Sequence, residues 1–250
     1  WYTESGEAQL SFNRQTTDIS ILLKSLHSGP VHLVGQGLGA EIAMWFAIRF
    51  PSQVKSLSLL SAVAALEGTQ YQTCQHWRRL ISARKNSQHR LNTVFAESTP
   101  LLYEQLAVDR FSDDYQIEHQ EELQVCAKWF EKRLSSNILM GFINLLDLKC
   151  RLQRAESLID ELPSIEIPTL VMNGALDRFA APRIGAEMCQ LLPLAKQVVV
   201  PGAGHELVRE KSLITSAQLA AYIESQVSGG ESSERNPRGF YGVDQLYNVA

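Results

Sequence analysis

Residues 31–62 decide the fold of this chain, and they read VHLVGQGLGAEIAMWFAIRFPSQVKSLSLLSA. Val31–Val34 is almost wholly apolar, as in a strand that is buried on both faces. The apolar residues of 40–50 recur at helical spacing until a proline stops the helix. Leu57–Leu60 then supplies a second apolar run. The stretch therefore predicts a strand, a sharp turn, a helix and a second strand of one parallel sheet.

The turn between the first strand and the helix reads Gly35-Gln36-Gly37-Leu38-Gly39. It resembles the nucleophile elbow of the α/β-hydrolase family, strand–G-x-S-x-G–helix, with glycine where that motif has its serine. Gly37 has no side chain with which to attack a substrate. Glycine tolerates the strained elbow backbone better than any other residue, so the geometry can persist without the nucleophile. The spacing does not match the dinucleotide-binding pattern G-x-G-x-x-G.

Two later residues match the same family in place and order. Thr169–Gly174 reads as a strand, and Asp177 stands just past its end, where ligands bind in open parallel sheets. Lys196–Val200 reads as the last strand, and His205 lies in the glycine-rich loop after it. The resemblance implies that Asp177 is the acid and His205 the base of a triad. A turn or helix-capping role is the alternative for the aspartate.

The resemblance also implies a function. The backbone N–H of Leu38 would stabilise an oxyanion, and Gln36, Trp77 and Trp129 are expected to contact substrate. Without a serine, we expect the histidine–aspartate pair to act as a general base on water or on an acidic substrate carbon. The expected partner is a small to medium hydrophobic carbonyl compound, an ester, lactone or thioester. The alternatives are a non-catalytic binding or interaction protein and a hydrolase inactivated by a serine-to-glycine change.

About 100 residues of helical spacing separate the two parts of this expected α/β fold, a parallel sheet flanked by helices. The predicted organisation is a core part with the elbow (1–66), an all-helical lid (67–163), a second core part with the aspartate and histidine (164–228) and a flexible tail (229–250). Most lid aromatics are expected to form the lid's own core, with one or two at the pocket. The predicted lid helices are Gln75–Arg84, Pro100–Ala107, Ile117–Leu134, Ile138–Leu148 and Arg151–Leu162.

Helices are also predicted for Gln15–His27 and Leu207–Val227. In the resembled family several strands and the loop that completes the oxyanion hole precede the first of these helices. Residues 1–14 are too few to supply them, and the chain does not begin with methionine. We therefore expect an absent N-terminal part, another chain or a second copy to pair with Val31–Val34 and complete the sheet.

Composition narrows the class of protein. The 250 residues are 45% hydrophobic and 20% charged, with a formal charge of -4, which argues against a nucleic-acid surface. No apolar run approaches the roughly 18 residues of a membrane span, and no secretory signal opens the chain. The four cysteines lack C-x-x-C spacing, which favours reduced thiols in a cytoplasmic protein over disulfides or a zinc site. We expect neither a metal nor a cofactor.

Overall fold

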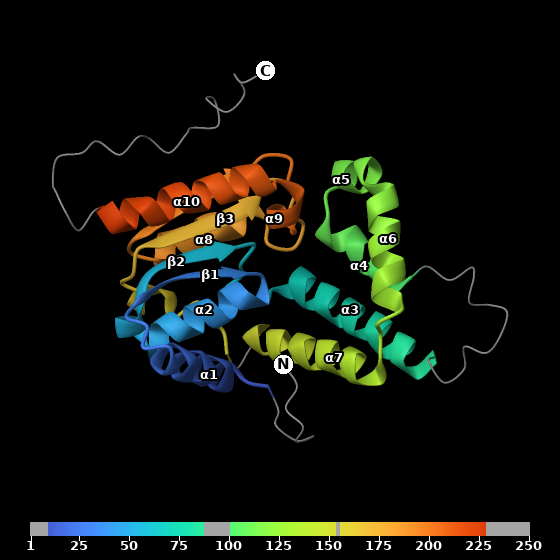
Figure 1. The fold of residues 1–250 in the computed structure, drawn as a ribbon, viewed down its shortest axis with the longest axis horizontal. Helices are drawn as coiled ribbons and strands as arrows, with labels where there is room; N and C mark the ends of the chain where they lie inside the picture. The colour runs from blue at the N-terminus through green and yellow to red at the C-terminus, as the bar shows by residue number, and fades with distance from the viewer. Residues whose placement is uncertain (1–9, 88–100, 154–155, 229–250) are drawn as a thin grey trace, which may run out of the picture.

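A four-stranded parallel sheet forms the core of the computed structural model, which describes residues 10–87, 101–153 and 156–228. The strands lie in the order β1-β2-β3-β4, and every neighbouring pair is parallel (Figure 1). This arrangement confirms the expected α/β fold class. The strands are β1 (Val31–Gln36), β2 (Val54–Leu60), β3 (Thr169–Gly174) and β4 (Ala195–Val200).

Helices cover both faces of the sheet. One apolar cluster joins the sheet to α1, α2 and α8, and it includes Phe12, Phe46 and Met188. A second cluster joins the other face to α10 through Tyr222 (Figure 1). The two central strands, β2 and β3, are buried along nearly their whole length in this way. The helices are α1 (Phe12–Ser25), α2 (Leu38–Arg49), α8 (Pro182–Leu191), α9 (Leu207–Glu210) and α10 (Ser212–Ser228).

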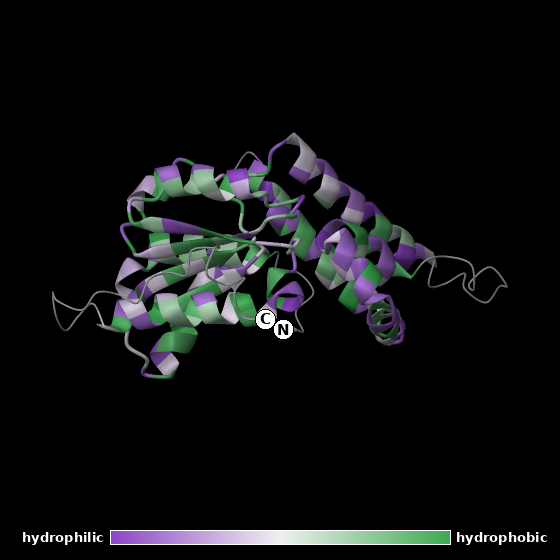
Figure 2. Cartoon of the chain, turned by 90° about the horizontal axis from the view of Figure 1, so that it is seen from above, coloured by the Kyte–Doolittle hydropathy of each residue, from purple (hydrophilic) through white to green (hydrophobic). Residues whose placement is uncertain are grey.

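In the described part of the chain between β2 and β3, five α-helices form a separate group, which we call the helical insertion. Figure 2 shows this group beyond one end of the sheet. Within it α3 packs along α7, and α4 packs against α6. Its own small cores bury leucine, isoleucine and aromatic side chains. Five of its aromatic residues also line the cavity described below, more than the one or two that the sequence predicts. The helices are α3 (Gly68–Ser87), α4 (Leu102–Arg110), α5 (Asp113–Glu118), α6 (Gln120–Glu131) and α7 (Ser136–Cys150).

The predicted strand–turn–helix–strand unit is confirmed in β1, α2 and β2, but three predicted helices differ. The predicted helix Ile117–Leu134 is interrupted at His119, between α5 and α6. Within the described part of Arg151–Leu162 the backbone makes a short 3-10 helix at Arg151–Gln153 and a turn at 159–161, and not one α-helix. The Leu158 N–H donates to the carbonyl of Ala64, 2.8 Å away, and so ties this segment to the core. The predicted single helix Leu207–Val227 is broken at Lys211, which separates α9 from α10. The break lets Glu210 turn inward and bond to two backbone amides.

Strand β1 lies at the edge of the sheet. Among the described strands it pairs with β2 alone, and the side chain of Val34 is 45% exposed. In β1, His32 bonds to Ser56 Oγ of β2 at 2.8 Å. None of the helices in the described ranges has the length and hydropathy that a bilayer crossing requires. The predicted tail 229–250 lies outside the described residues.

Candidate functional site

The turn from β1 into α2 has the conformation of an elbow. Gly37 has φ 52° and ψ -124°, a backbone region that favours glycine. Its carbonyl accepts the N–H of Ala40 at 2.9 Å and so begins α2. The turn requires glycine at position 35, because a Cβ atom there would stand 2.4 Å from the carbonyl oxygen of Gly39. The strand and helix therefore meet at backbone contact distance.

His205 and Asp177 form a buried pair beside this elbow. The Nδ1 atom of His205 lies 2.9 Å and 3.2 Å from the two carboxylate oxygens of Asp177. The carboxylate also accepts the N–H groups of Phe179 and Ala180, each at 2.8 Å. Burial alone would raise the pKa of Asp177, but His205 and these amides outweigh it and hold the pKa below 3.8. The ionised aspartate fixes the tautomer that carries hydrogen on Nδ1, which leaves Nε2 as an acceptor.

The backbone of His205 is held from three sides. Its N–H donates to the carbonyl of Arg110 in the helical insertion at 2.9 Å. Its carbonyl accepts the hydroxyl of Ser61 at 2.9 Å and the amide of Gln36 at 3.3 Å. The ring of Phe179 meets the imidazole edge-on, with centroids 5.3 Å apart. These contacts fix the direction in which Nε2 points.

Nε2 faces the elbow. A Cβ atom built on Gly37 would lie 3.7 Å from Nε2, in ordinary van der Waals contact. The imidazole thus stands where it would activate a nucleophile bound over Gly37, whether a serine hydroxyl or a water. The orienting carboxylate of Asp177 contacts one ring nitrogen, and the other ring nitrogen faces the elbow.

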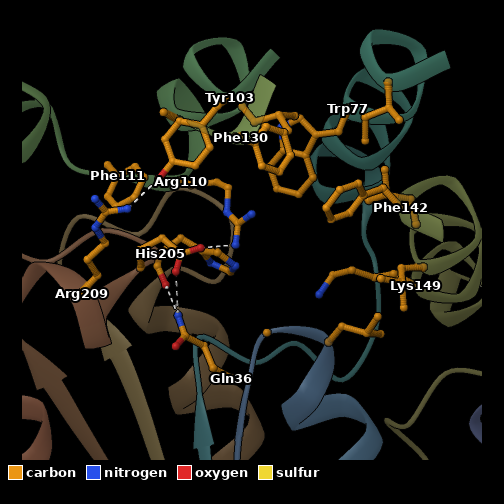
Figure 3. Close-up of a pocket in the computed structure, with 18 residues that line it drawn as sticks. Gln36, Trp77, Tyr103, Arg110, Phe111, Phe130, Phe142, Lys149, His205 and Arg209 are labelled. Carbon is orange, nitrogen blue, oxygen red and sulfur yellow. Dashed lines mark hydrogen bonds and ion pairs between the residues drawn. The ribbon is translucent and has the colours of Figure 1, made fainter. Parts of the chain in front are cut away.

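A cavity of about 620 Å³ opens over the elbow between the core and the helical insertion. Gly37 and Leu38 of the elbow line it, together with Gln36 and His205, which Figure 3 shows side by side. The opposite wall is apolar and largely aromatic, which suits a hydrophobic ligand of moderate size. Its aromatic lining residues are Trp77, Tyr103, Phe111, Phe130 and Phe142.

The two tryptophans that the sequence places at the substrate have different positions. Trp77 lines the cavity, stacks on Phe179 with centroids 5.5 Å apart and donates its Nε1–H to Asp109 at 2.9 Å. Trp129 is not among the lining residues and is 56% exposed on α6, with the guanidinium of Arg133 3.8 Å above its ring. The structure therefore brings Trp77 to the site and leaves Trp129 on the surface. Its position on α6 could not be read from helical spacing alone.

Glu210 connects the helical insertion to the histidine loop. One carboxylate oxygen accepts both the N–H of Ser112, at 3.0 Å, and the N–H of Gly204, at 2.9 Å. The loop is packed so tightly that a Cβ atom on Gly204 would lie 2.7 Å from the same Ser112 nitrogen. Sequence reasoning missed this residue, since it places Glu210 inside one continuous helix.

The sequence also did not predict an ion pair between Lys149 and Glu41. The ammonium of Lys149 on α7 contacts both carboxylate oxygens of Glu41 on α2, at 2.6 Å and 2.9 Å. The available signal was Glu41 itself, a lone charge in the apolar segment that follows the elbow. A charge in such a segment needs a buried partner. Nothing in the sequence around Lys149 identifies that partner.

Comparison with known proteins shows the family of this chain. Residues 5–212 match the family described as alpha/beta hydrolase fold, and the chain belongs to that family. A protein of Bacillus subtilis (strain 168), provisionally named 2-succinyl-6-hydroxy-2,4-cyclohexadiene-1-carboxylate synthase, is 24% identical over 86% of this chain and 73% of its own length. The monoacylglycerol lipase ABHD6 of Bos taurus is 25% identical over 93% of this chain and 66% of its own length.

Solved structures agree on the fold. The crystal structure of MGS-M2, an alpha/beta hydrolase enzyme from a Medee basin deep-sea metagenome library, superposes with a TM-score of 0.74 at 19% identity. The match covers 92% of this chain and 76% of that one. The chain thus spans roughly two thirds to three quarters of these relatives.

Proposed function

We propose that the cavity binds a small to medium hydrophobic carbonyl compound and that His205 acts on it as a general base. The observation that carries the proposal is the position of Nε2, which lies 3.7 Å from the point where a Cβ atom on Gly37 would stand. The other ring nitrogen is hydrogen-bonded to Asp177. Aromatic side chains of the helical insertion, which acts as a lid over the site, supply the apolar surface for the substrate. The name of the bovine relative, a monoacylglycerol lipase, supports an ester as one such substrate.

The reaction that this geometry supports is hydrolysis without a covalent intermediate. A water molecule over Gly37 donates its proton to Nε2 as its oxygen bonds to the carbonyl carbon. The negative charge that develops on the carbonyl oxygen is stabilised by the Leu38 N–H at the start of α2. Nε2 then returns the proton to the leaving alcohol or thiol as the carbon–oxygen or carbon–sulfur bond breaks. A lactone would open by the same steps.

A second candidate is a binding protein that uses the same cavity without turnover. The absence of a side chain at Gly37 favours it, since loss of the serine removes most of the rate enhancement of a triad. A hydrolase inactivated by a serine-to-glycine change would look the same. Binding and turnover must therefore be measured on one set of ligands.

The test compares His205→Ala with His76→Ala, an exposed histidine on α3 outside the cavity lining. Purified protein is assayed for hydrolysis of p-nitrophenyl butyrate, S-phenyl thiobutyrate and γ-nonalactone. We expect His205→Ala to lower turnover by about 10² to 10⁴ and His76→Ala to leave it unchanged. Equal turnover in the parent and in His205→Ala would overturn the catalytic proposal. Binding without turnover in the parent would establish the second candidate.

We also propose that another segment of chain adds as a strand to the free edge of β1. Among the described strands the edge is unpaired on this side, and Val34 of β1 is 45% exposed. An open edge with an exposed apolar side chain favours pairing over solvation. Substitution of Val34 by lysine should weaken self-association measured by sedimentation. A monomer at micromolar concentration in both proteins would contradict pairing between copies.

A further inference from the structure

The ion pair between Lys149 and Glu41 lies next to the candidate site. Glu41 is fully buried at the fourth residue after Gly37, and Lys149 is 6% exposed near the end of α7. Burial raises the pKa of Glu41, and the ammonium of Lys149 opposes that rise. The pair therefore joins α7 of the helical insertion to α2, one helical turn after Gly37.

The ammonium of Lys149 also faces the cavity. Lys149 lines the cavity, and Figure 3 shows its Nζ atom directed into the open space opposite His205. Within the described residues, the carboxylate of Glu41 is the one group that accepts hydrogen bonds from Nζ, through its two oxygens. An ammonium carries three N–H groups. At least one of them is thus left for a ligand in the cavity.

The two arginines that line the cavity are paired with carboxylates, as Lys149 is, but their side chains are more exposed than that of Lys149. The guanidinium of Arg110 pairs with Glu206, and its side chain is 45% exposed. Arg209 donates to Tyr103 at 2.7 Å and to Glu122 at 2.7 Å. Lys149 is more deeply buried than either arginine, and the ring centroid of Phe179 lies 4.9 Å from its Nζ. A low-dielectric setting strengthens a hydrogen bond from a charged donor.

We propose that Lys149 is an anion-binding residue of the cavity, whose ammonium receives the carboxylate of a hydrophobic acid while Glu41 holds it in place. The ligand class is then an aryl or alkyl group that fills the aromatic wall, with a carboxylate directed at Lys149. The inference deepens the proposed function, because it adds an acid group to the hydrophobic carbonyl compound expected in the same cavity. It does not depend on turnover, since it concerns ligand binding alone.

A pair of matched ligands tests the inference. Titration calorimetry at about pH 8, where an ordinary imidazole is neutral, compares 4-phenylbutyrate with 4-phenylbutanamide, which has the same shape and no charge. The parent protein should bind the carboxylate about 10- to 100-fold more tightly than the amide. Lys149→Met should abolish this preference and retain affinity for the amide.

Two further proteins keep the result interpretable. Lys149→Met leaves Glu41 buried without a partner, so the double variant Glu41→Gln/Lys149→Met removes both charges at nearly constant volume. Lys24→Met removes the same charge from the exposed surface of α1 and should keep the full preference. Equal binding of both ligands to the parent, or a preference that survives in the double variant, would overturn the anion-binding role and leave the proposed function standing. Failure of both ligands to bind the parent would overturn the hydrophobic cavity itself, and with it this inference.

Discussion

The Nε2 atom of His205 lies 3.7 Å from the point at which a Cβ atom on Gly37 would stand, and it is the one described contact within 4 Å of that point. A serine side chain therefore fits the elbow with its hydroxyl on the side of the imidazole. The backbone at Gly37, with φ 52°, already has the positive angle that an elbow imposes. The structure needs no rearrangement to receive a nucleophile.

We expect Gly37→Ser to gain ester hydrolysis. Nε2 would accept the serine proton, and the activated oxygen would form an acyl-enzyme with p-nitrophenyl butyrate. Turnover should rise on the order of 10²-fold or more, with a burst of p-nitrophenolate at high enzyme concentration. Gly37→Ala is the matched control, because it has the same backbone strain of about 1–3 kcal/mol and no hydroxyl. Equal rates in the two variants would show that the oxyanion-stabilising part of the site is inadequate.

Gly35 and Gly39 provide a second matched pair, on stability. A Cβ atom on Gly35 would stand 2.4 Å from the Gly39 carbonyl oxygen, whereas one on Gly39 would meet nothing within 4 Å. Gly35→Ala should therefore lower the free energy of unfolding by about 1–3 kcal/mol or more, because backbone cannot move aside cheaply. Gly39→Ala, inside α2, should leave it unchanged or raise it by up to about 1 kcal/mol. Urea denaturation measures both, and similar losses would contradict the close approach of strand and helix.

The elbow could be predicted because its determinants are local. The apolar run of β1, the alternating glycines and the helical spacing of α2 occupy one short stretch, so pattern and structure agree there. Asp177 and His205 were predictable from their places after two strands, since parallel strands bring their carboxyl ends to one edge of the sheet. The 2.9 Å contact between them is a consequence of that topology.

The residues that sequence reasoning missed depend on contacts between distant segments. Lys149 and Glu41 are 108 residues apart, and Glu210 bonds to Ser112 across 98 residues. No periodicity reports such a pairing. Trp129 was predicted to contact substrate but lies outside the cavity lining, for a related reason. The pattern of an amphipathic helix shows that one face is buried but does not show which neighbour buries it. Tertiary packing, and not propensity, decides these positions.

Glu210 should be a stability determinant of the histidine loop. Glu210→Ala would leave the N–H groups of Ser112 and Gly204 without their common acceptor in a buried place. We expect a loss of about 2–6 kcal/mol in the free energy of unfolding, since each of the two buried unsatisfied donors costs about 1–3 kcal/mol. Glu224→Ala, an exposed glutamate on α10, should change it by less than about 0.5 kcal/mol. Comparable effects of the two substitutions would mean that the insertion is not anchored through Glu210.

Asp177 should make the stability of the protein depend on pH in the acid range. Because the pKa of Asp177 lies below 3.8 in the folded protein, the ionised carboxylate stabilises the fold, and its contribution is fully present above the unfolded value. It is lost as the pH falls from 3.8 through the folded pKa. Asp177→Asn keeps the shape and removes the charge, so at pH 7 it should cost about 1–3 kcal/mol.

The difference in unfolding free energy between the parent and Asp177→Asn should therefore be constant near neutral pH and shrink below pH 3.8. Urea titrations across the acid range measure it, and Asp160→Asn, an exposed aspartate before β3, serves as the control with a small difference throughout. A difference that widens as the pH falls would have the wrong sign for an ionised Asp177. It would mean that burial, and not the bonds to His205, Phe179 and Ala180, dominates at this carboxylate, and the histidine would then lack the charged partner that a general base requires.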